Sequence, residues 1–337
     1  MAIPASATSP RPKVTLPPIE EVKKLPVPEI AATARQLIAN VEKVIVGKHE
    51  QVVLAVTGWL AEGHLLIEDV PGVAKTMLAR AMAQSAGCTF KRIQCTPDLQ
   101  PADVLGEARL DPQTGRSEFY FGPLFSQFVL VDEINRASPR TQSALLEAMG
   151  EGLVTAGSVT YRLQRPFMVI ATQNPVEQAG TFLLPEAQKD RFLLRMNLGY
   201  PALADEKQML ERFQSQHPIE TLLPVTTPDH LQRCQEAVRD LKVETPVSDY
   251  ILALVRATRE HPALLLGASP RGSLGLFRAA QALAAIEGSN SVTLAHVKTL
   301  APKVLAHRFI VRPEEKHRNT KVADVVAEIM VRLELAA

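Results

Sequence analysis

Short apolar runs alternate with amphipathic segments over residues 30–200. Four of these runs are rich in branched side chains: HLLIE (64–68), FKRIQ (90–94), FVLVDE (128–133) and FMVIAT (167–172). Runs of this length are typical of strands buried on both faces of a parallel sheet. Between them, residues 76–86 and 139–150 have helical patterns, and Ser138 can cap the second helix. The alternation predicts a doubly wound α/β domain.

Two further segments, 110–122 and 152–166, each place a glycine between short β-type runs, which predicts two hairpins. The strand pattern ends after Pro201. Residues 201–337 are therefore expected to form an all-α lid domain, with helical patterns at about 204–214, 228–241, 247–260, 270–287, 293–308 and 321–336.

The first 29 residues contain seven prolines, which predicts an extended or disordered arm before the domain at 30–200. The arm lacks the apolar core of a signal peptide. The most apolar stretch of the chain, VVLAVTGWLAEGHLLI, is short and interrupted by glycines and polar residues. It is therefore expected to form a helix, a turn and a strand rather than to insert into a membrane.

The overall charge is balanced, with 37 Lys and Arg against 36 Asp and Glu in 337 residues. This balance disfavours binding to nucleic acid or to anionic lipid through bulk charge. The three cysteines form no C-x-x-C pair, which indicates a reducing compartment and hence the cytoplasm.

The segment EDVPGVAKTMLAR (68–80) resembles the phosphate-binding loop G-x-x-x-x-G-K-[ST]. Lys75 and Thr76 fit the last two positions, whereas Asp69 and Ala74 replace the two glycines. A predicted strand enters the loop and a predicted helix leaves it, so backbone N–H groups and the helix dipole favour a phosphate there. Lys75 is then expected to contact the phosphates and Thr76 to bind Mg²⁺. The alternative is a capped surface turn with a solvated lysine.

Two other strand ends carry polar side chains. In FVLVDEINRA (128–137), Asp132 is expected to hold Mg²⁺ and Glu133 to act as the general base on a water. In IATQNP (170–175), Asn174 could orient that water or contact a phosphate. The alternatives are strand ends that simply meet water, and a turn-forming asparagine before a proline.

With these blocks in view, the chain resembles the MoxR family of AAA+ ATPases, which is related to the magnesium-chelatase ATPase subunits. The resemblance runs from VIVGKHE (44–50) to RPEEKHR (312–318). It is carried by six further blocks in the family order: GHLLIEDVPGVAKT, FKRIQCTPDLQPADVLG, LVDEINRASPRTQSALLEAM, IATQNPVEQAGTFLLPEAQKDRF, GASPRGSLGL and VLAHRF. It implies a P-loop AAA+ core with a parallel sheet between helices, followed by an all-α lid. The hairpins then correspond to a helix-2 insert at about 106–122 and a hairpin before sensor 1 at about 152–166.

The resemblance also implies roles for single residues. Asn174 matches sensor 1, Arg191 matches the arginine finger, which is presented to the nucleotide of a neighbouring subunit, and Arg271 matches sensor 2. Each arginine could instead form an ordinary salt bridge. Arg136 could contact the subunit interface or pair with Glu133 or Glu147. The expected nucleotide-binding residues are Val46, Gly47, Val70, Pro71, Gly72, Val73, Ala74, Lys75, Thr76, Met77 and Asp132, with Thr76 and Asp132 also expected to bind Mg²⁺.

Asp69 conflicts with a phosphate site if its carboxylate points inward. Two like charges ~4 Å apart at an effective dielectric constant of ~20 repel by on the order of 4 kcal/mol. If the site is functional, Asp69 is therefore expected to turn away and to accept a loop N–H group or pair with a basic side chain. We expect it to weaken ATP binding modestly; the alternative is that it has disabled the site.

The resemblance implies an oligomeric ATPase, dependent on ATP and Mg²⁺, that remodels, matures or inserts metal cofactors into partner proteins. The family typically forms ring hexamers, often with partners that carry a von Willebrand A domain. One alternative is a nucleotide-dependent binding switch with weak or no hydrolysis. Another is a nucleic-acid motor, which the near-neutral charge and the 5% aromatic content disfavour.

Overall fold

The computed structural model describes residues 25–110, 117–156, 159–174, 181–212, 217–317 and 322–335. Its strands are β1 (Leu65–Glu68), β2 (Phe90–Gln94), β3 (Gly106–Leu110), β4 (Ser117–Phe121), β5 (Phe128–Asp132), β6 (Leu153–Ala156), β7 (Val159–Arg162), β8 (Met168–Gln173), β9 (Leu194–Met196), β10 (Lys242–Val243), β11 (Leu264–Leu266), β12 (Ser291–Val292) and β13 (Ile310–Val311).

Its α-helices are α1 (Val27–Glu42), α2 (His49–Leu60), α3 (Lys75–Ser85), α4 (Pro101–Leu105), α5 (Pro139–Glu151), α6 (Glu186–Lys189), α7 (Leu203–Arg212), α8 (Pro228–Arg239), α9 (Thr245–Glu260), α10 (Pro270–Ile286), α11 (Leu294–Leu305), α12 (Pro313–His317) and α13 (Val322–Leu335). Short 3₁₀ turns are η1 (Pro123–Phe125), η2 (Ile134–Arg136), η3 (Pro218–Glu220) and η4 (Ala306–Arg308).

A five-stranded sheet in the order β2-β5-β8-β1-β9 forms the centre of the α/β part, and all its neighbouring strands are parallel. The four strands expected from the apolar runs are confirmed. The expectation of burial on both faces is wrong for β2, because it is an edge strand whose Lys91, Arg92 and Gln94 are exposed. Strand β9 was not expected, since its three residues are too few to give a pattern.

The two faces of the sheet enter two separate apolar cores. Along β1, Leu65 and Ile67 join a core with residues of α1, α2 and α3, whereas Leu66 joins a core with residues of α4 and α5. The period-two alternation of a strand sends neighbouring side chains to opposite faces. Helices therefore cover both faces, as expected for a doubly wound domain.

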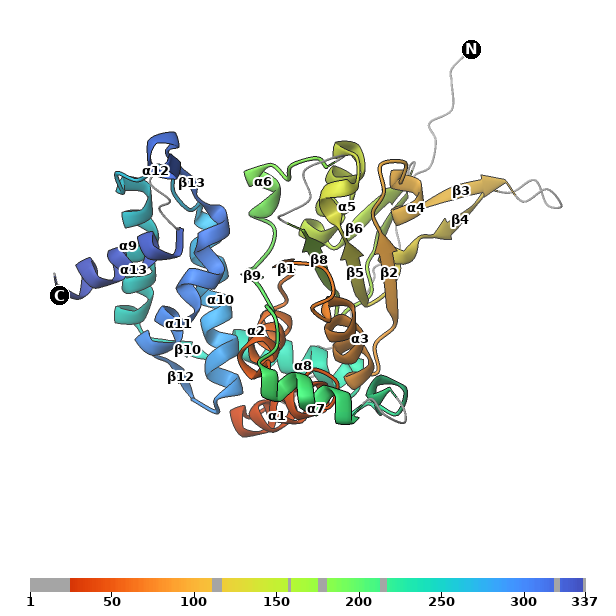
Figure 1. Ribbon diagram of the computed structural model, residues 1–337, viewed down its shortest axis with the longest axis horizontal. Helices are drawn as coiled ribbons and strands as arrows, with labels where there is room; N and C mark the ends of the chain where they lie inside the picture. The colour runs from red at the N-terminus through yellow and green to blue at the C-terminus, as the bar shows by residue number, and fades with distance from the viewer. Residues whose placement is uncertain are drawn as a thin grey trace, which may run out of the picture.

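Part of the helical region after Pro201 forms a second body, whereas α8 packs against α1 and α2 of the α/β part. Helices α9, α10, α11 and α13 lie together on the left of Figure 1, and the β3–β4 hairpin projects on the opposite side. The six helices expected there are present, but two short pairings, β10–β12 and β11–β13, lie among them. The domain boundary at Pro201 stays a prediction, because one apolar core runs from the sheet through α8 into α10.

Three of the described helices begin at a capping hydroxyl group, and the cap expected at Ser138 is confirmed. The hydroxyl oxygens of Ser138, Thr227 and Ser269 each accept a backbone N–H from the first turn of their helices. Helix α1 begins at Val27, so the last three residues of the expected arm are helical; residues 1–24 lie outside the described residues. No helix in the described part of the chain is long and apolar enough to span a bilayer.

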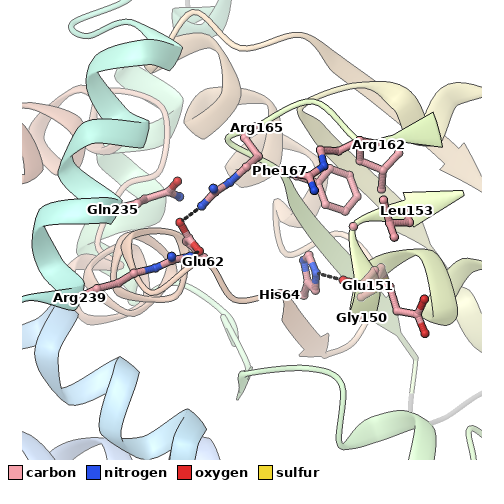
Figure 2. Close-up of a pocket in the computed structure, with 13 residues that line it drawn as sticks. Glu62, His64, Gly150, Glu151, Leu153, Arg162, Arg165, Phe167, Gln235 and Arg239 are labelled. Carbon is pink, nitrogen blue, oxygen red and sulfur yellow. Dashed lines mark hydrogen bonds and ion pairs between the residues drawn. The ribbon is translucent and has the colours of Figure 1, made fainter. Parts of the chain in front are cut away.

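His64 precedes β1 and ties it to two other elements. Its Nε2 lies 3.0 Å from the Met149 carbonyl at the end of α5, as the dashed line in Figure 2 marks, and its Nδ1 lies 3.1 Å from the Val169 nitrogen. A neutral ring that donates from Nε2 and accepts at Nδ1 satisfies both partners. Burial lowers the pKa of His64 to about 4, although the hydrogen bond to Met149 acts in the opposite direction.

This lowered pKa predicts a loss of stability at acidic pH. Between pH 6.5 and 4 the unfolded chain binds a proton at this residue and the folded chain does not, so the free energy of unfolding falls as the pH falls. From pH 7 to 5 we expect His64 to account for about 2 kcal/mol. Urea unfolding at both pH values should therefore show a decline about 2 kcal/mol larger in the wild type than in His64→Gln. Equal declines would contradict the assignment.

Candidate functional site

The loop at 69–74 connects β1 to α3 at the carboxyl end of the sheet. Gly72 has a φ of 84°, and a Cβ placed there would meet no atom within 4 Å, so the space above the loop is open. Ala74 has a φ of 61° and turns the chain into α3, which begins at Lys75. The Lys75 ammonium group lies 2.7 Å from the backbone oxygen of Asp69. The loop therefore has the shape that lets backbone N–H groups and a lysine face an anion.

The two acids at the end of β5 are held by residues of neighbouring strands. Thr172 of β8 donates to Asp132 Oδ1 at 2.5 Å and accepts the Glu133 N–H at 2.9 Å. Arg92 of β2 donates to Asp132 Oδ2 at 2.6 Å, and Gln94 donates to Glu133 Oε2 at 3.0 Å. Sequence reasoning missed these three partners. For Arg92 and Gln94, the polar residues at alternate positions of FKRIQ were a usable signal.

Glu133 has a second basic partner and an unusual backbone. Arg136 donates to Glu133 Oε2 at 3.0 Å, which is one of the pairings expected from the sequence. The φ of Glu133 is 56°. Among the described residues, three that are not glycine have positive φ, and two of them, Ala74 and Glu133, line the same cavity. Left-handed backbone at such residues costs about 1 kcal/mol or more and concentrates at functional sites.

One cavity of about 350 Å³ brings the expected polar residues together. Its lining is Pro71, Gly72, Ala74, Lys75, Thr76, Arg92, Asp132, Glu133 and Asn174. Lysine, backbone N–H groups, a hydroxyl and two carboxylates thus meet in one space. This set of groups suits a phosphate chain together with a divalent cation, because it offers both positive donors and oxygen ligands. We refer to this space as the phosphate cavity.

A second cavity, of about 340 Å³, adjoins the first and shares Gly72 and Ala74 with it. Its walls come from residues 44–48, the loop, the connector at 198–201 and α7, and they are mostly apolar. An apolar slot next to a phosphate site has the character needed to hold a planar base. We refer to this space as the base cavity.

Not every expected nucleotide-binding residue lines these two cavities. Val46 and Val73 line the base cavity, but Gly47 does not; it has a φ of 70°, and a Cβ there would collide with Asp205 of α7. Val70 and Met77 line neither cavity. Val70 donates its N–H to the Asp69 carboxylate, and Met77 packs against the main apolar core.

Asp69 points away from both cavities, as expected. The residue is buried and lines neither space. Its Oδ1 accepts the Val70 N–H at 2.9 Å, and its Oδ2 accepts those of Leu198 and Gly199 at 2.6 Å each. The expected hydrogen bond to the loop is therefore confirmed, and two bonds to the connector at 198–201 are added.

Arg191 and Arg271 are not brought to the phosphate cavity. Both line a separate cavity of about 230 Å³ together with Arg278, Arg308 and Asp190. Arg191 donates to the Leu146 carbonyl at 2.9 Å, and Arg271 lies 4.0 Å from the Asp190 carboxylate. We refer to this space as the arginine cavity.

The arginine cavity lies at the opposite end of the sheet from the phosphate cavity. Arg191 precedes β9, whose first residue, Leu194, pairs with Leu65 at the start of β1, whereas the loop follows the end of β1. A strand rises about 3.3 Å per residue, so the four residues of β1 separate the two ends by roughly 13 Å. The two cavities share no lining residue. One copy of the chain therefore does not bring its own Arg191 and Arg271 to its own loop.

A fourth cavity, of about 330 Å³, adjoins the arginine cavity and is drawn in Figure 2. Glu62 forms ion pairs with both Arg165 and Arg239 there. The ring of His64 at its floor is neutral because burial lowers the pKa to about 4. Charges that pair with one another, and a neutral histidine with both nitrogens bonded, indicate structural roles for these side chains.

Comparisons with known proteins agree with this arrangement. Residues 64–194 match a family model described as the ATPase family associated with various cellular activities (AAA), and residues 256–329 match one described as an AAA lid domain. The first match contains the loop, both acids, Asn174 and Arg191. The second begins within α9 and contains Arg271.

Two curated relatives cover most of the chain. The uncharacterized protein YeaC of Bacillus subtilis is 46% identical over 293 residues, which cover 87% of this chain and 92% of that protein. Chaperone MoxR1 of Mycobacterium tuberculosis is 42% identical over 289 residues, covering 82% and 76% respectively. A crystal structure of a candidate ATPase from Cytophaga hutchinsonii superposes with a TM-score of 0.84 at 34% identity, and covers 90% of this chain and 95% of that one.

Proposed function

Because the chain belongs to the MoxR family of AAA+ ATPases, we propose that the phosphate and base cavities together bind ATP with Mg²⁺ and that the residues around them hydrolyse it. The observation that carries this proposal is the convergence of Lys75, Thr76, Asp132, Glu133 and Asn174 on one cavity beside an apolar slot. The two spaces adjoin at the loop, as a triphosphate joined to a base requires.

Each polar residue has a role that follows from its chemistry. Lys75 and the loop N–H groups face the phosphates and stabilise the charge that develops on them. Thr76 and Asp132 hold Mg²⁺, which neutralises phosphate charge when bound. Glu133 takes the proton of the attacking water at its carboxylate, and Asn174 orients that water.

Arg191 and Arg271 act on the nucleotide of a neighbouring subunit in this proposal. Their cavity lies at the opposite end of the sheet from the loop and carries an excess of positive charge. A subunit that docks its phosphate cavity against this surface would receive both arginines at the γ-phosphate. Repetition of that head-to-tail contact closes a ring, and the hexamer is the usual ring of the family.

The alternative to an efficient ATPase is a nucleotide-dependent switch that hydrolyses ATP only weakly. One observation favours it. Arg92 pairs with Asp132 at 2.6 Å, while Gln94 and Arg136 engage Glu133 at 3.0 Å each. Both acids must leave these partners before they serve the metal and the water. A low basal turnover that rises on assembly or on contact with a partner protein follows from this arrangement.

Partner proteins are the proposed target, since a close relative is named a chaperone. The two hairpins support this proposal. Phe119 of β4 stacks on Tyr161 of β7 at 4.8 Å, so the hairpins are joined, while Tyr120 and Phe121 are more than half exposed. Exposed aromatic side chains on a hairpin that projects from the molecule (Figure 1) suit contact with another protein. A protein with a von Willebrand A domain is the expected class of partner.

The three cysteines are free thiols, which supports the cytoplasm as the location.

The roles of Glu133 and Lys75 predict that a change at Glu133 impairs ATP hydrolysis and that a change at Lys75 impairs ATP binding. Glu133→Gln keeps the shape of the side chain but removes the base, so ATP binding should stay within about twofold while hydrolysis falls about a hundredfold or more. Lys75→Ala should lose ATP binding, because a cation that faces the phosphates is removed. Calorimetric titration with ATP·Mg²⁺ and phosphate release measure the two effects, with Glu236→Gln on α8 as the control. Hydrolysis at the wild-type rate by Glu133→Gln would contradict the role of that residue.

The placement of the arginines predicts complementation between subunits. Arg191→Ala and Arg271→Ala should each bind ATP like the wild type and lose hydrolysis, by about a thousandfold for Arg191. Mixing either variant with Lys75→Ala should restore activity, because one subunit supplies the loop and the other the arginines. Different tags on the two variants verify that mixed assemblies form. If these mixed assemblies still lack activity, the arginines do not act on the nucleotide of a neighbouring subunit.

A further inference from the structure

The Asp69 carboxylate is buried at the junction of the loop and the connector at 198–201. Residue 69 is only 8% exposed, and its two carboxylate oxygens accept three backbone N–H groups. Two of these come from successive residues, Leu198 and Gly199, which converge on Oδ2. The φ of Gly199 is 65°, and such a left-handed residue aims successive N–H groups at one anion.

The connector is one wall of the base cavity. Leu198, Gly199 and Tyr200 line that cavity, and the connector leads directly into α7, which contributes Glu206, Met209 and Leu210. A shift of the connector therefore changes the space available to the base. The phosphate cavity contains no residue of the connector or of α7.

Packing holds the α7 part of this wall only weakly, whereas Leu198 of the connector is buried in the main apolar core. Helix α7 has no buried residue, and Leu203 and Leu210 are 84% and 74% exposed. Beyond Leu198, polar contacts hold the connector: Asp69 bonds it from the side of the loop, and Lys48 donates to the Tyr200 carbonyl at 2.8 Å. Of these two side chains only Asp69 is buried, whereas the Lys48 bond is exposed, and a hydrogen bond to a charged group contributes most where it is buried.

We propose that Asp69 is a positioning residue that fixes the wall of the base cavity, so that affinity for the base depends on it and affinity for the phosphates does not. This proposal rests on the proposed function, because it takes the apolar slot to be the base site. It also reverses the sign expected from the sequence, where a carboxylate near the phosphates was expected to weaken ATP binding. The carboxylate instead strengthens binding through the connector.

Two variants test the role of Asp69. One changes the carboxylate that accepts the hydrogen bonds, and the other changes the connector that donates them. Asp69→Asn keeps the size of the side chain but turns one acceptor oxygen into an amide that faces N–H donors. Gly199→Ala leaves Asp69 unchanged but strains the left-handed residue that presents two of the donors. Glu68→Gln is the matched control, since Glu68 also joins β1 to β9, through Arg195 at 3.1 Å, and lines neither cavity.

Calorimetric titrations with ATP and with inorganic tripolyphosphate, both with Mg²⁺, separate the base from the phosphates. Asp69→Asn should weaken ATP binding about tenfold to a hundredfold, and Gly199→Ala about tenfold, while tripolyphosphate binding stays within about twofold. Glu68→Gln should change neither. Thermal melting identifies any variant that is unfolded, and the other variant then carries the test.

Other results of these titrations would overturn either the role of Asp69 or the proposed function. Unchanged ATP binding by both folded variants would overturn the proposal, and so would an equal loss of ATP and tripolyphosphate, because the carboxylate would then act through the phosphate loop. A wild-type protein that binds tripolyphosphate and ATP with the same affinity would overturn it as well. No binding of either probe at millimolar concentration would instead overturn the proposed function itself.

Discussion

Parallel pairing is the constraint on which the arrangement of the site depends. Strands that run in one direction bring all their carboxyl ends to one edge of the sheet and all their amino ends to the other. The loop after β1, the acids after β5 and Asn174 after β8 therefore meet at one edge. Arg191 precedes β9 and lies at the other edge. In the proposed ring, the two half-sites that face each other across a subunit contact are thus built on opposite ends of each subunit.

Buried charges hold together the residues at each of these two edges of the sheet, because a charge removed from water needs close partners. At the loop, Asp69 joins the phosphate side to the connector. At the other edge, Arg308 is 5% exposed and donates to the Asp190 carboxylate and to the carbonyl oxygens of Asp190 and Phe192. Asp190 also accepts the hydroxyl of Ser269, which caps α10. The segment that carries Arg191 and the helix that begins beside Arg271 are therefore held as one unit.

The sequence predicts best where a local pattern decides the structure. Apolar runs located four strands of the sheet, and Ser138 marked a helix start, because strand burial and capping act over a few residues. The loop lysine and the acids were found by their order at strand ends. What the sequence did not reveal depends on contacts between distant segments: Thr172 beside Asp132 and the exposure of an edge strand.

In the proposed assembly, one subunit alone lacks a complete site. Turnover per subunit, measured as phosphate release over a range of protein concentrations with sedimentation velocity at each, tests it most directly. Turnover should be negligible while the protein sediments as a monomer and should rise in step with the assembled fraction. Constant turnover per subunit down to concentrations at which only monomer sediments would contradict it.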